Sequence, residues 1–147
     1  MAMRVRIVCP EHSAYDADAT FVSIPSTDGN LGVAARHANE ICTIDAGFVT
    51  ICDEKIGEVS HTFAVGVGYA EITGDEVVIL AERAQDLSVL DRDKVQADIQ
   101  GFEEKLSNLS KDDARRSYLY NEIAWCKLLL SKIRAQCDEM SIATYLR

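Results

Sequence analysis

The spacing of apolar positions changes near residue 88 of this 147-residue chain. Before that point, short runs of β-favouring residues alternate with turn-forming Gly, Asp, Asn and Ser, a pattern typical of antiparallel strands. After it, apolar residues recur every three or four positions, which is typical of amphipathic helices. The sequence therefore predicts an α+β fold, with an N-terminal β-sandwich over residues 1–86 and a C-terminal antiparallel two-helix hairpin over residues 87–147.

Seven segments of the first domain are predicted to be strands, and the regular spacing of turns favours a sandwich or a barrel. These strands are Arg4–Cys9, Ala17–Ile24, Glu40–Ile44, Phe48–Cys52, Glu58–Val65, Tyr69–Thr73 and Glu76–Leu80, with a turn expected over residues 25–30. The run Val77–Ala81 is apolar without alternation, so both faces of that strand are expected to be covered. Gly66 and Gly68 are expected to let a strand bend across a corner. Gly29 and Gly32 are expected at a tight turn followed by a close backbone approach.

Two apolar seams joined by a short loop predict the hairpin. The seam residues are Val95, Ile99, Phe102, Leu106 and Leu109 in the first helix and Leu119, Ile123, Cys126, Leu130, Ile133 and Cys137 in the second. Ser110 followed by Asp113 has the spacing of a capping box, which predicts Ser110 as the N-cap of the second helix. Gly101 is expected to weaken the first helix by about 1 kcal/mol relative to Ala, and to mark a close helix approach or a flexible point.

The net charge of −9 argues against a nucleic-acid-binding protein, because phosphate contacts need a basic surface. The charge is unevenly divided: residues 1–87 hold 14 acids and 5 bases, whereas residues 88–147 hold 10 of each. This asymmetry in charge indicates that the two regions have different functions. The longest apolar runs are too short to cross a bilayer, and the N-terminus has no signal-peptide pattern. Membrane association is therefore expected only through partners.

The sequence contains no motif that is typical of a catalytic site. His12, His37 and His61 are widely separated in the sequence and predict no metal site. The sequence has no G-x-x-x-x-G-K-[ST] phosphate-binding loop and no G-x-S-x-G nucleophile motif. Its five cysteines lack a C-x-x-C pair and are expected to be reduced and mostly buried in a cytosolic protein. We therefore expect no catalytic residue, no metal and no cofactor.

Several segments carry a resemblance to one family over nearly the whole chain. Residues 9–11 and Val22–Val33 are similar to an S/T-P-E … V-x-x-P-x-x-D/E-G-x-L/M-G-I pattern, and His37 lies where the family carries a histidine. Phe63–Ile72 and Val77–Ala84 are similar to a second pattern, a glycine-kinked strand, a turn and V-x-I-L-A-x-x-A. With the helical hairpin behind them, these segments resemble the epsilon subunit of the F-type (bacterial) ATP synthase.

The resemblance implies a rotor function without catalysis. The sandwich would dock on the gamma subunit and the c-ring, forming part of the central stalk of a proton- or sodium-translocating enzyme. It would lie on the cytoplasmic face of the cell membrane as a peripheral component. The loops that hold Leu31, Arg36 and His37 are expected at or beside this docking surface. The loop after His37 is polar in this chain, whereas the family places a proline and apolar residues there.

The resemblance also implies a regulatory function for the hairpin. When extended, it would contact the alpha and beta subunits of the catalytic head and inhibit ATP hydrolysis. The bases that would face acidic segments of the head are Arg115, Arg116, Lys127, Lys132 and Arg134. The other interpretation of these bases is a solvated helix face.

Some members of the family bind ATP at an I/L-D-x-x-R-A motif that opens the first helix. Leu90 and Asp91 match this motif, but Lys94 replaces the arginine and Val95 replaces the alanine. Because lysine lacks the planar fork of a guanidinium, we expect ATP to bind in the millimolar range or not at all. The candidate contacts for bound ATP are Asp91, Lys94, Arg115 and Arg116.

Two other interpretations of the chain remain open at this point. One is a self-associating interaction module whose hairpin pairs with a second copy, because seam residues alone do not distinguish that pairing from an intramolecular hairpin. The other is a small-molecule-binding or enzymatic domain, although the sequence has no convergent polar cluster.

Overall fold

The computed structural model describes the backbone of residues 2–145 and the side chains of residues 2–133. It divides into two compact units, Met1–Leu90 and Asp91–Arg147. The first unit contains β1 (Met3–Val8), β2 (Ser13–Ala19), β3 (Phe21–Ser26), β4 (Gly29–Ala34), β5 (Glu40–Ile44), β6 (Gly47–Cys52), β7 (His61–Val65), β8 (Gly68–Ile72), β9 (Glu76–Ala81), β10 (Ala84–Asp86) and the 3-10 helix η1 (Leu87–Val89). The second contains α1 (Arg92–Ser107) and α2 (Arg115–Tyr145). The division lies later than the predicted one because η1 packs against β7.

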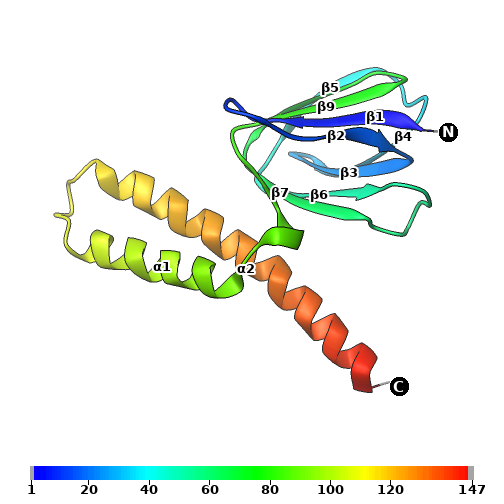
Figure 1. Cartoon of the computed structure of the whole chain (residues 1–147). Helices are drawn as coiled ribbons and strands as arrows, with labels where there is room; N and C mark the ends of the chain where they lie inside the picture. The colour runs from blue at the N-terminus through cyan, green and yellow to red at the C-terminus, as the bar shows by residue number, and fades with distance from the viewer. Residues whose placement is uncertain (1, 146–147) are drawn as a thin grey trace. The chain divides into compact units, whose positions relative to one another are not determined.

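The strands form one hydrogen-bonded sheet that folds into two layers (Figure 1). In one layer the strands lie in the order β10, β7, β6, β3 and β4, and in the other they lie in the order β5, β8, β9, β1 and β2. The layers are joined where Ser26 pairs with Ile44. β1 and β9 run parallel, whereas β1 and β2, and β8 and β9, run antiparallel. The predicted β-sandwich followed by two helices is confirmed.

The core lies between the layers and consists mainly of inward-facing Ile and Val side chains. The largest fully buried ones include Ile7, Ile24, Ile44, Ile51, Ile72 and Ile79. Burying one such side chain contributes about 1.5–3 kcal/mol, so this core dominates the stability of the unit. On β9, Val77 and Ile79 belong to the core, but Val78 and Leu80 on the other face are only half-buried. The expectation that both faces of this strand are covered is therefore wrong.

Several strands differ from the prediction; for example, the predicted strand Glu58–Val65 begins only at His61 in β7. The segment Ala17–Ile24, predicted as one strand, is divided between β2 and β3 at Thr20. The Thr20 hydroxyl donates to the carbonyl oxygen of Asp53 at 2.8 Å, which holds the chain at this corner. β4 was not predicted as a strand, and it begins inside the region predicted as a turn, where Gly29, at a φ of 122°, already pairs with Ser26. β10 was not predicted, since its three residues are too short to show a pattern.

Gly66 and Gly68 lie where the chain crosses from one layer to the other. β7 pairs with β6 and β10, whereas β8 pairs with β5 and β9. A Cβ at Gly68 would overlap the backbone carbonyl oxygen of Leu80, so no larger residue fits there. The predicted corner is confirmed, although Gly66 lies between two strands and Gly68 begins the second, so the glycines do not kink a single strand. A Cβ on Gly32 would lie 2.6 Å from Cζ of Phe21, a side chain and not the expected backbone.

Carboxylates cap both helices of the second unit. The Asp91 side chain accepts the N–H of Asp93 at 3.0 Å and so caps the start of α1. The Asp113 side chain accepts the N–H of Arg115 at 2.9 Å at the start of α2. Ser110, the predicted N-cap, lies instead in the loop, where its carbonyl oxygen accepts the N–H of Asp113 at 3.1 Å. That prediction is therefore wrong.

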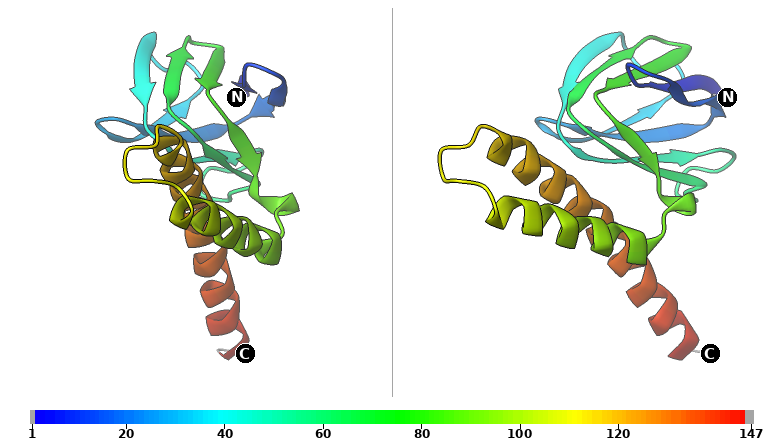
Figure 2. Two further views of the ribbon diagram at one scale, coloured as in Figure 1. Left: turned by 90° about the vertical axis from the view of Figure 1, so that its left-hand side faces the viewer. Right: turned by 60° about the vertical axis from the view of Figure 1, so that its left-hand side comes forward.

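The two helices pack against each other as an antiparallel hairpin (Figure 2). The buried seam residues are Val95, Leu119, Ile123, Cys126 and Leu130, and the half-buried ones are Ile99, Phe102, Leu106, Leu109 and Ile133. The side chain of Cys137 lies outside the described residues. A Cβ on Gly101 would have nothing within 4 Å, so this glycine marks no close helix approach. The predicted seams are thus satisfied within one chain.

Candidate functional site

The layer that contains β5, β8, β9 and β1 carries a cluster of apolar side chains on its outer surface. We call this cluster the outer apolar face; it consists of Val8, Ile41, Val67, Tyr69, Val78 and Leu80. Ile41 is 73% exposed, Val67 is 50% exposed and Tyr69 is 49% exposed. Contiguous exposed apolar groups of this kind mark interaction sites on proteins.

The register of the sheet places these side chains next to one another. Tyr69 pairs with Leu80 across β8 and β9, and Leu80 pairs with Val8 across β9 and β1. In the next row, Glu71 pairs with Val78 on one side and with Ile41 on the other. Side chains at paired positions point to the same face, with Cβ atoms about 4.5–5.5 Å apart. The outer apolar face is therefore contiguous from Tyr69 through Leu80 to Val8, with Val78 on the same strand as Leu80, whereas Glu71 lies between Val78 and Ile41.

A hollow of about 460 Å³ opens at one end of the outer apolar face. It is lined by Val8, Cys9, Pro10, Val67, Gly68, Tyr69, Leu80, Ala81 and Glu82. Nearly all of these residues are apolar, and Glu82 is the charged residue at its edge. The hollow has the size and lining to receive an apolar side chain of a partner.

Ion pairs border the outer apolar face on β1 and β2. Arg4 Nε lies 2.6 Å from Asp16 Oδ1, and Arg6 Nη1 lies 3.3 Å from Glu76 Oε1. The hydrogen bond from Arg4 lowers the pKa of the Asp16 carboxyl, and the same bond raises the pKa of Arg4. Because these charges are exposed and paired within their own layer, each pair contributes little to the stability of the fold.

The three predicted docking residues lie in different surroundings. Leu31 is half-buried and packs against the core from β4. Arg36 lies between β4 and β5 at a φ of 67°, and its N–H donates to the carbonyl oxygen of Gly74 at 2.8 Å. In the same loop, Nδ1 of His37 lies 2.7 Å from the carbonyl oxygen of Ala38. The loop that holds Arg36 and His37 leads directly into β5, which contains Ile41. Leu31, in contrast, packs against the core.

The predicted regulatory bases of α2 are not equivalent. Arg115 is held by Asp113, with Nη2 2.7 Å from Oδ2 and Nε 3.1 Å from Oδ1. Arg116 donates from Nη1 to the carbonyl oxygen of Leu106 at 3.1 Å. Lys127 is exposed and Lys132 is half-buried. The side chain of Arg134 lies outside the described residues.

The four candidate ATP contacts do not form one cluster in this hairpin. Asp91 and Lys94 lie at the start of α1, where Asp91 acts as the N-cap. Arg116 bonds to Leu106, near the end of the same helix. A helix of 16 residues is about 24 Å long at 1.5 Å per residue. Asp91 and Lys94 therefore lie near one end of α1, whereas Arg116 contacts the other end.

The outer apolar face was not predicted from the sequence, although the uninterrupted apolar run Val77–Ala81 contains two of its residues. A strand without alternation is apolar on both faces, and we interpreted this as burial on both faces. In the structure one face of β9 enters the core, and the other forms part of an exposed surface. Ile41 was predicted within the strand Glu40–Ile44, but its exposure was not predicted.

Within the described part of the chain, no three His, Cys, Asp or Glu side chains gather in a way that could hold a metal ion. Cys9, Cys52 and Cys126 are buried and Cys42 is half-buried, and none of these four is in a disulfide. Burial raises the pKa of the Cys9 and Cys42 thiols, so they stay protonated and inert near neutral pH. No described helix combines the length and the apolar content that a bilayer span needs.

Comparisons with known proteins agree on one family. Residues 2–86 match the family described as the beta-sandwich domain of the ATP synthase delta/epsilon chain. The chain is 31% identical over 125 residues to an ATP synthase epsilon chain of Gloeothece citriformis, covering 85% of this chain and 88% of that protein. It is 30% identical over 141 residues to the chloroplastic epsilon chain of Guillardia theta, covering 96% of this chain and 99% of that protein.

Solved structures share the fold. A chain of the Euglena gracilis mitochondrial ATP synthase, solved as an OSCP/F1/c-ring assembly, matches with a TM-score of 0.70 at 17% identity, covering 90% of this chain and 81% of that chain. A chain from the central stalk and c-ring of the Tetrahymena thermophila mitochondrial enzyme matches with a TM-score of 0.52 at 16% identity, covering 90% and 96%. At such identities the likeness concerns the fold alone.

Proposed function

The chain belongs to the ATP synthase epsilon-chain family, and from this premise we propose that it is a non-catalytic subunit of the central stalk of an F-type ATP synthase. It couples the rotation of the c-ring, driven by protons or sodium ions, to the catalytic head. The observation that carries this proposal is the outer apolar face, whose most exposed member, Ile41, is 73% accessible. Contact between this apolar surface and water is unfavourable, and a permanent partner would bury the surface.

The partners at this face are the gamma subunit and the c-ring. The fold relatives described above come from assemblies that contain a c-ring or a central stalk, which supports this choice. A partner side chain entering the hollow beside Tyr69 and Leu80 would bury apolar surface at about 25 cal/mol per Å². The complex would hold the subunit at the cytoplasmic face of the cell membrane as a peripheral component.

The hairpin is proposed to regulate ATP hydrolysis. In the closed hairpin, Arg115 and Arg116 are engaged by Asp113 and by the Leu106 carbonyl oxygen. Opening would release Arg116 toward acidic segments of the alpha and beta subunits, but it would also expose both apolar seams. The gross cost of that exposure is on the order of 10 kcal/mol. The free subunit therefore keeps its hairpin closed, and only contacts in the assembled enzyme compensate for opening.

ATP is not proposed as a tight ligand of the hairpin. The replacement of arginine by Lys94 and the separation of Asp91 from Arg116 both argue for binding in the millimolar range or none. Isothermal titration of the full chain with ATP checks this expectation, and saturation at tens of micromolar would contradict it.

A matched pair of variants tests the docking surface. Ile41→Glu places a charge on the outer apolar face, whereas Ile56→Glu places the same charge at a 57% exposed isoleucine outside this face. We expect Ile41→Glu to weaken binding to a gamma–c-ring complex by tenfold or more, since burying an unpaired charge costs several kcal/mol. Ile56→Glu should bind like the unmodified chain. Equal binding by both variants would place the docking surface elsewhere.

Truncation tests the regulatory part. Cutting after Leu90 removes the whole helical unit and leaves the strand unit with its own core, whereas a cut after Leu109 would leave the apolar seam of α1 uncovered. We expect the enzyme assembled with the truncated chain to hydrolyse ATP faster while keeping its c-ring coupling. An unchanged rate, with other inhibition removed, would limit the hairpin to a structural role.

A further inference from the structure

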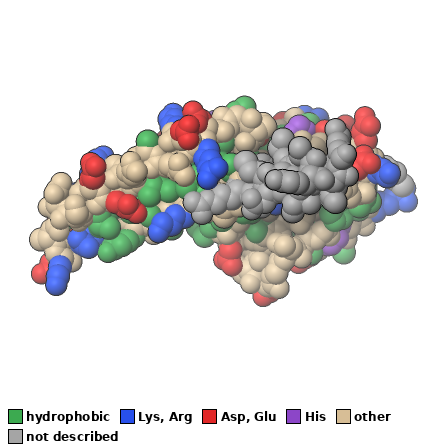
Figure 3. All heavy atoms as spheres, turned by 90° about the horizontal axis from the view of Figure 1, so that it is seen from below, with side chains coloured by type: hydrophobic (Ala, Val, Ile, Leu, Met, Phe, Trp, Pro, Cys, Tyr) green, Lys and Arg blue, Asp and Glu red, His purple; other side chains and the backbone are tan. Residues whose placement is uncertain are grey.

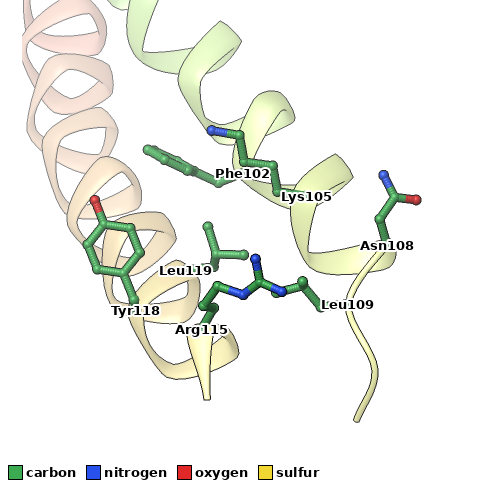
Figure 4. A pocket seen from close by; sticks show the side chains of 7 residues that line it. All are labelled: Phe102, Lys105, Asn108, Leu109, Arg115, Tyr118 and Leu119. Atoms are coloured by element: carbon green, nitrogen blue, oxygen red, sulfur yellow. The ribbon is translucent and has the colours of Figure 1, made fainter. Parts of the chain in front are cut away.

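The joined end of the helical hairpin contains a hollow that the stalk function does not use. It has a volume of about 420 Å³ and is lined by Phe102, Lys105, Asn108, Leu109, Arg115, Tyr118 and Leu119 (Figure 4). We call it the hairpin pocket. We propose that the hairpin pocket binds a small amphipathic anion, with an aromatic or aliphatic body and one carboxylate, sulfonate or phosphate group.

The apolar part of the pocket would hold the body of this ligand. Figure 4 shows the Phe102 ring on α1 directed toward α2, with Leu119 facing it from α2. Leu109 and Tyr118 complete the apolar walls, and the Tyr118 side chain is available because the residue is 61% exposed. Aromatic rings stack in offset or edge-on arrangements, so two aromatic walls favour a flat apolar body.

The polar part would hold the anionic group. The charged residues that line the pocket are Lys105 and Arg115; because Asp113 pairs with Arg115, the excess positive charge at the pocket comes from Lys105. Lys105 Nζ lies 5.8 Å from the centroid of the Phe102 ring, which places the ammonium group over the apolar wall. Asp113 binds Nε and Nη2 of Arg115 and so orients the guanidinium.

The size of the pocket favours a small molecule over a protein segment. Ligand pockets in proteins usually measure about 300–1,000 Å³, and this one lies at the lower end of that range. It is confined to the last turns of α1 and the first turns of α2, whereas a docking helix would need a groove along several turns. Figure 3 shows hydrophobic side chains beside lysine or arginine side chains near this end of the hairpin, at the left.

The test uses the full chain and the probe 1-anilinonaphthalene-8-sulfonate, a flat aromatic anion. Titration of the ¹⁵N-labelled chain, followed by NMR, should give saturable shifts of amides around Phe102–Leu109 and Arg115–Leu119. The uncharged analogue N-phenyl-1-naphthylamine should bind roughly tenfold more weakly, because it lacks the charge-assisted hydrogen bonds. No saturable binding, or shifts centred on other residues, would overturn the proposal.

Matched variants separate the pocket from general charge and hydrophobicity. Lys105→Gln should weaken binding of the sulfonate roughly tenfold, whereas Lys111→Gln, an exposed lysine in the adjoining loop, should leave it unchanged. Tyr118→Ala should also weaken it, whereas Tyr120→Ala, 53% exposed and outside the pocket, should not. Circular dichroism checks that each variant keeps its helices. Equal effects within either pair would refute the assignment. The result does not depend on the stalk function, because only the isolated chain is measured.

Discussion

Arg116 on α2 donates a hydrogen bond from Nη1 to the backbone carbonyl oxygen of Leu106 on α1, at 3.1 Å. The same nitrogen lies 3.3 Å from the carbonyl oxygen of Leu109, and Nη2 lies 3.1 Å from the Tyr120 hydroxyl. The last carbonyl groups of a helix have no partner within the helix itself. Arg116 therefore caps the end of α1 from across the hairpin, and this cap exists only while the hairpin is closed.

Replacing Arg116 should loosen the hairpin. Arg116→Gln removes charge-assisted hydrogen bonds to two carbonyl groups, and we expect it to destabilise the helical unit by about 1–2 kcal/mol. Amide hydrogen exchange at the end of α1 measures the effect directly. Lys127→Gln, at an exposed position of the same helix, is the control and should change exchange little. If the two variants exchange alike, the cap contributes nothing to closure.

Gly68→Ala should disrupt the strand unit. The added Cβ would overlap the backbone of Leu80, and a backbone cannot move aside as a flexible side chain can. We expect a loss of about 3 kcal/mol or more in the free energy of unfolding. Gly74→Ala is the matched control, since a Cβ there has nothing within 4 Å. Urea denaturation of both variants measures the difference, and a Gly68→Ala midpoint close to that of Gly74→Ala would contradict the overlap.

Gly101→Ala should stabilise the hairpin. Position 101 lies inside α1 with open space around it, so the glycine costs helix propensity without serving a contact. The expected gain is about 1 kcal/mol in the stability of the helical unit. Thermal unfolding monitored by helix ellipticity checks it, with the reverse change Ala97→Gly, at an exposed position of the same helix, expected to lower stability by a similar amount. A loss of stability in Gly101→Ala would mean that the glycine serves a conformation other than this helix.

Acid should weaken the start of α2. The hydrogen bonds from the Arg115 side chain and backbone lower the pKa of Asp113 to about 2, below its ordinary value of 3.8. A carboxyl with a lowered pKa in the folded state stabilises the fold above its unfolded pKa, and that contribution is lost as pH falls from about 4 to about 2. An NMR titration of the Asp113 carboxyl should give a midpoint near 2. In Asp113→Asn this part of the pH dependence should disappear. A midpoint near 3.8 would contradict the pairing with Arg115.

Local patterns of the sequence predicted most of the elements but not all of their ends. The helical seams were clear because each helix repeats its apolar positions over several turns. The start of α2 was misplaced because Ser110 and Asp113 both have capping chemistry, and sequence spacing alone does not decide which one the loop brings to the helix end. The break at Thr20 was missed because the bond that holds it, to Asp53, joins residues far apart in the sequence.

The sequence by itself determined that a strand domain precedes two helices, the seams of the hairpin and the absence of known catalytic motifs, because these follow from short-range periodicity and local spacing. Only the tertiary structure decided which apolar residues remain outside the core. Val78 and Leu80 alternate with Val77 and Ile79 on one strand, and nothing local distinguishes the two sets. Their exposure depends on which layer packs against which face, and that is set by contacts between residues distant in the chain.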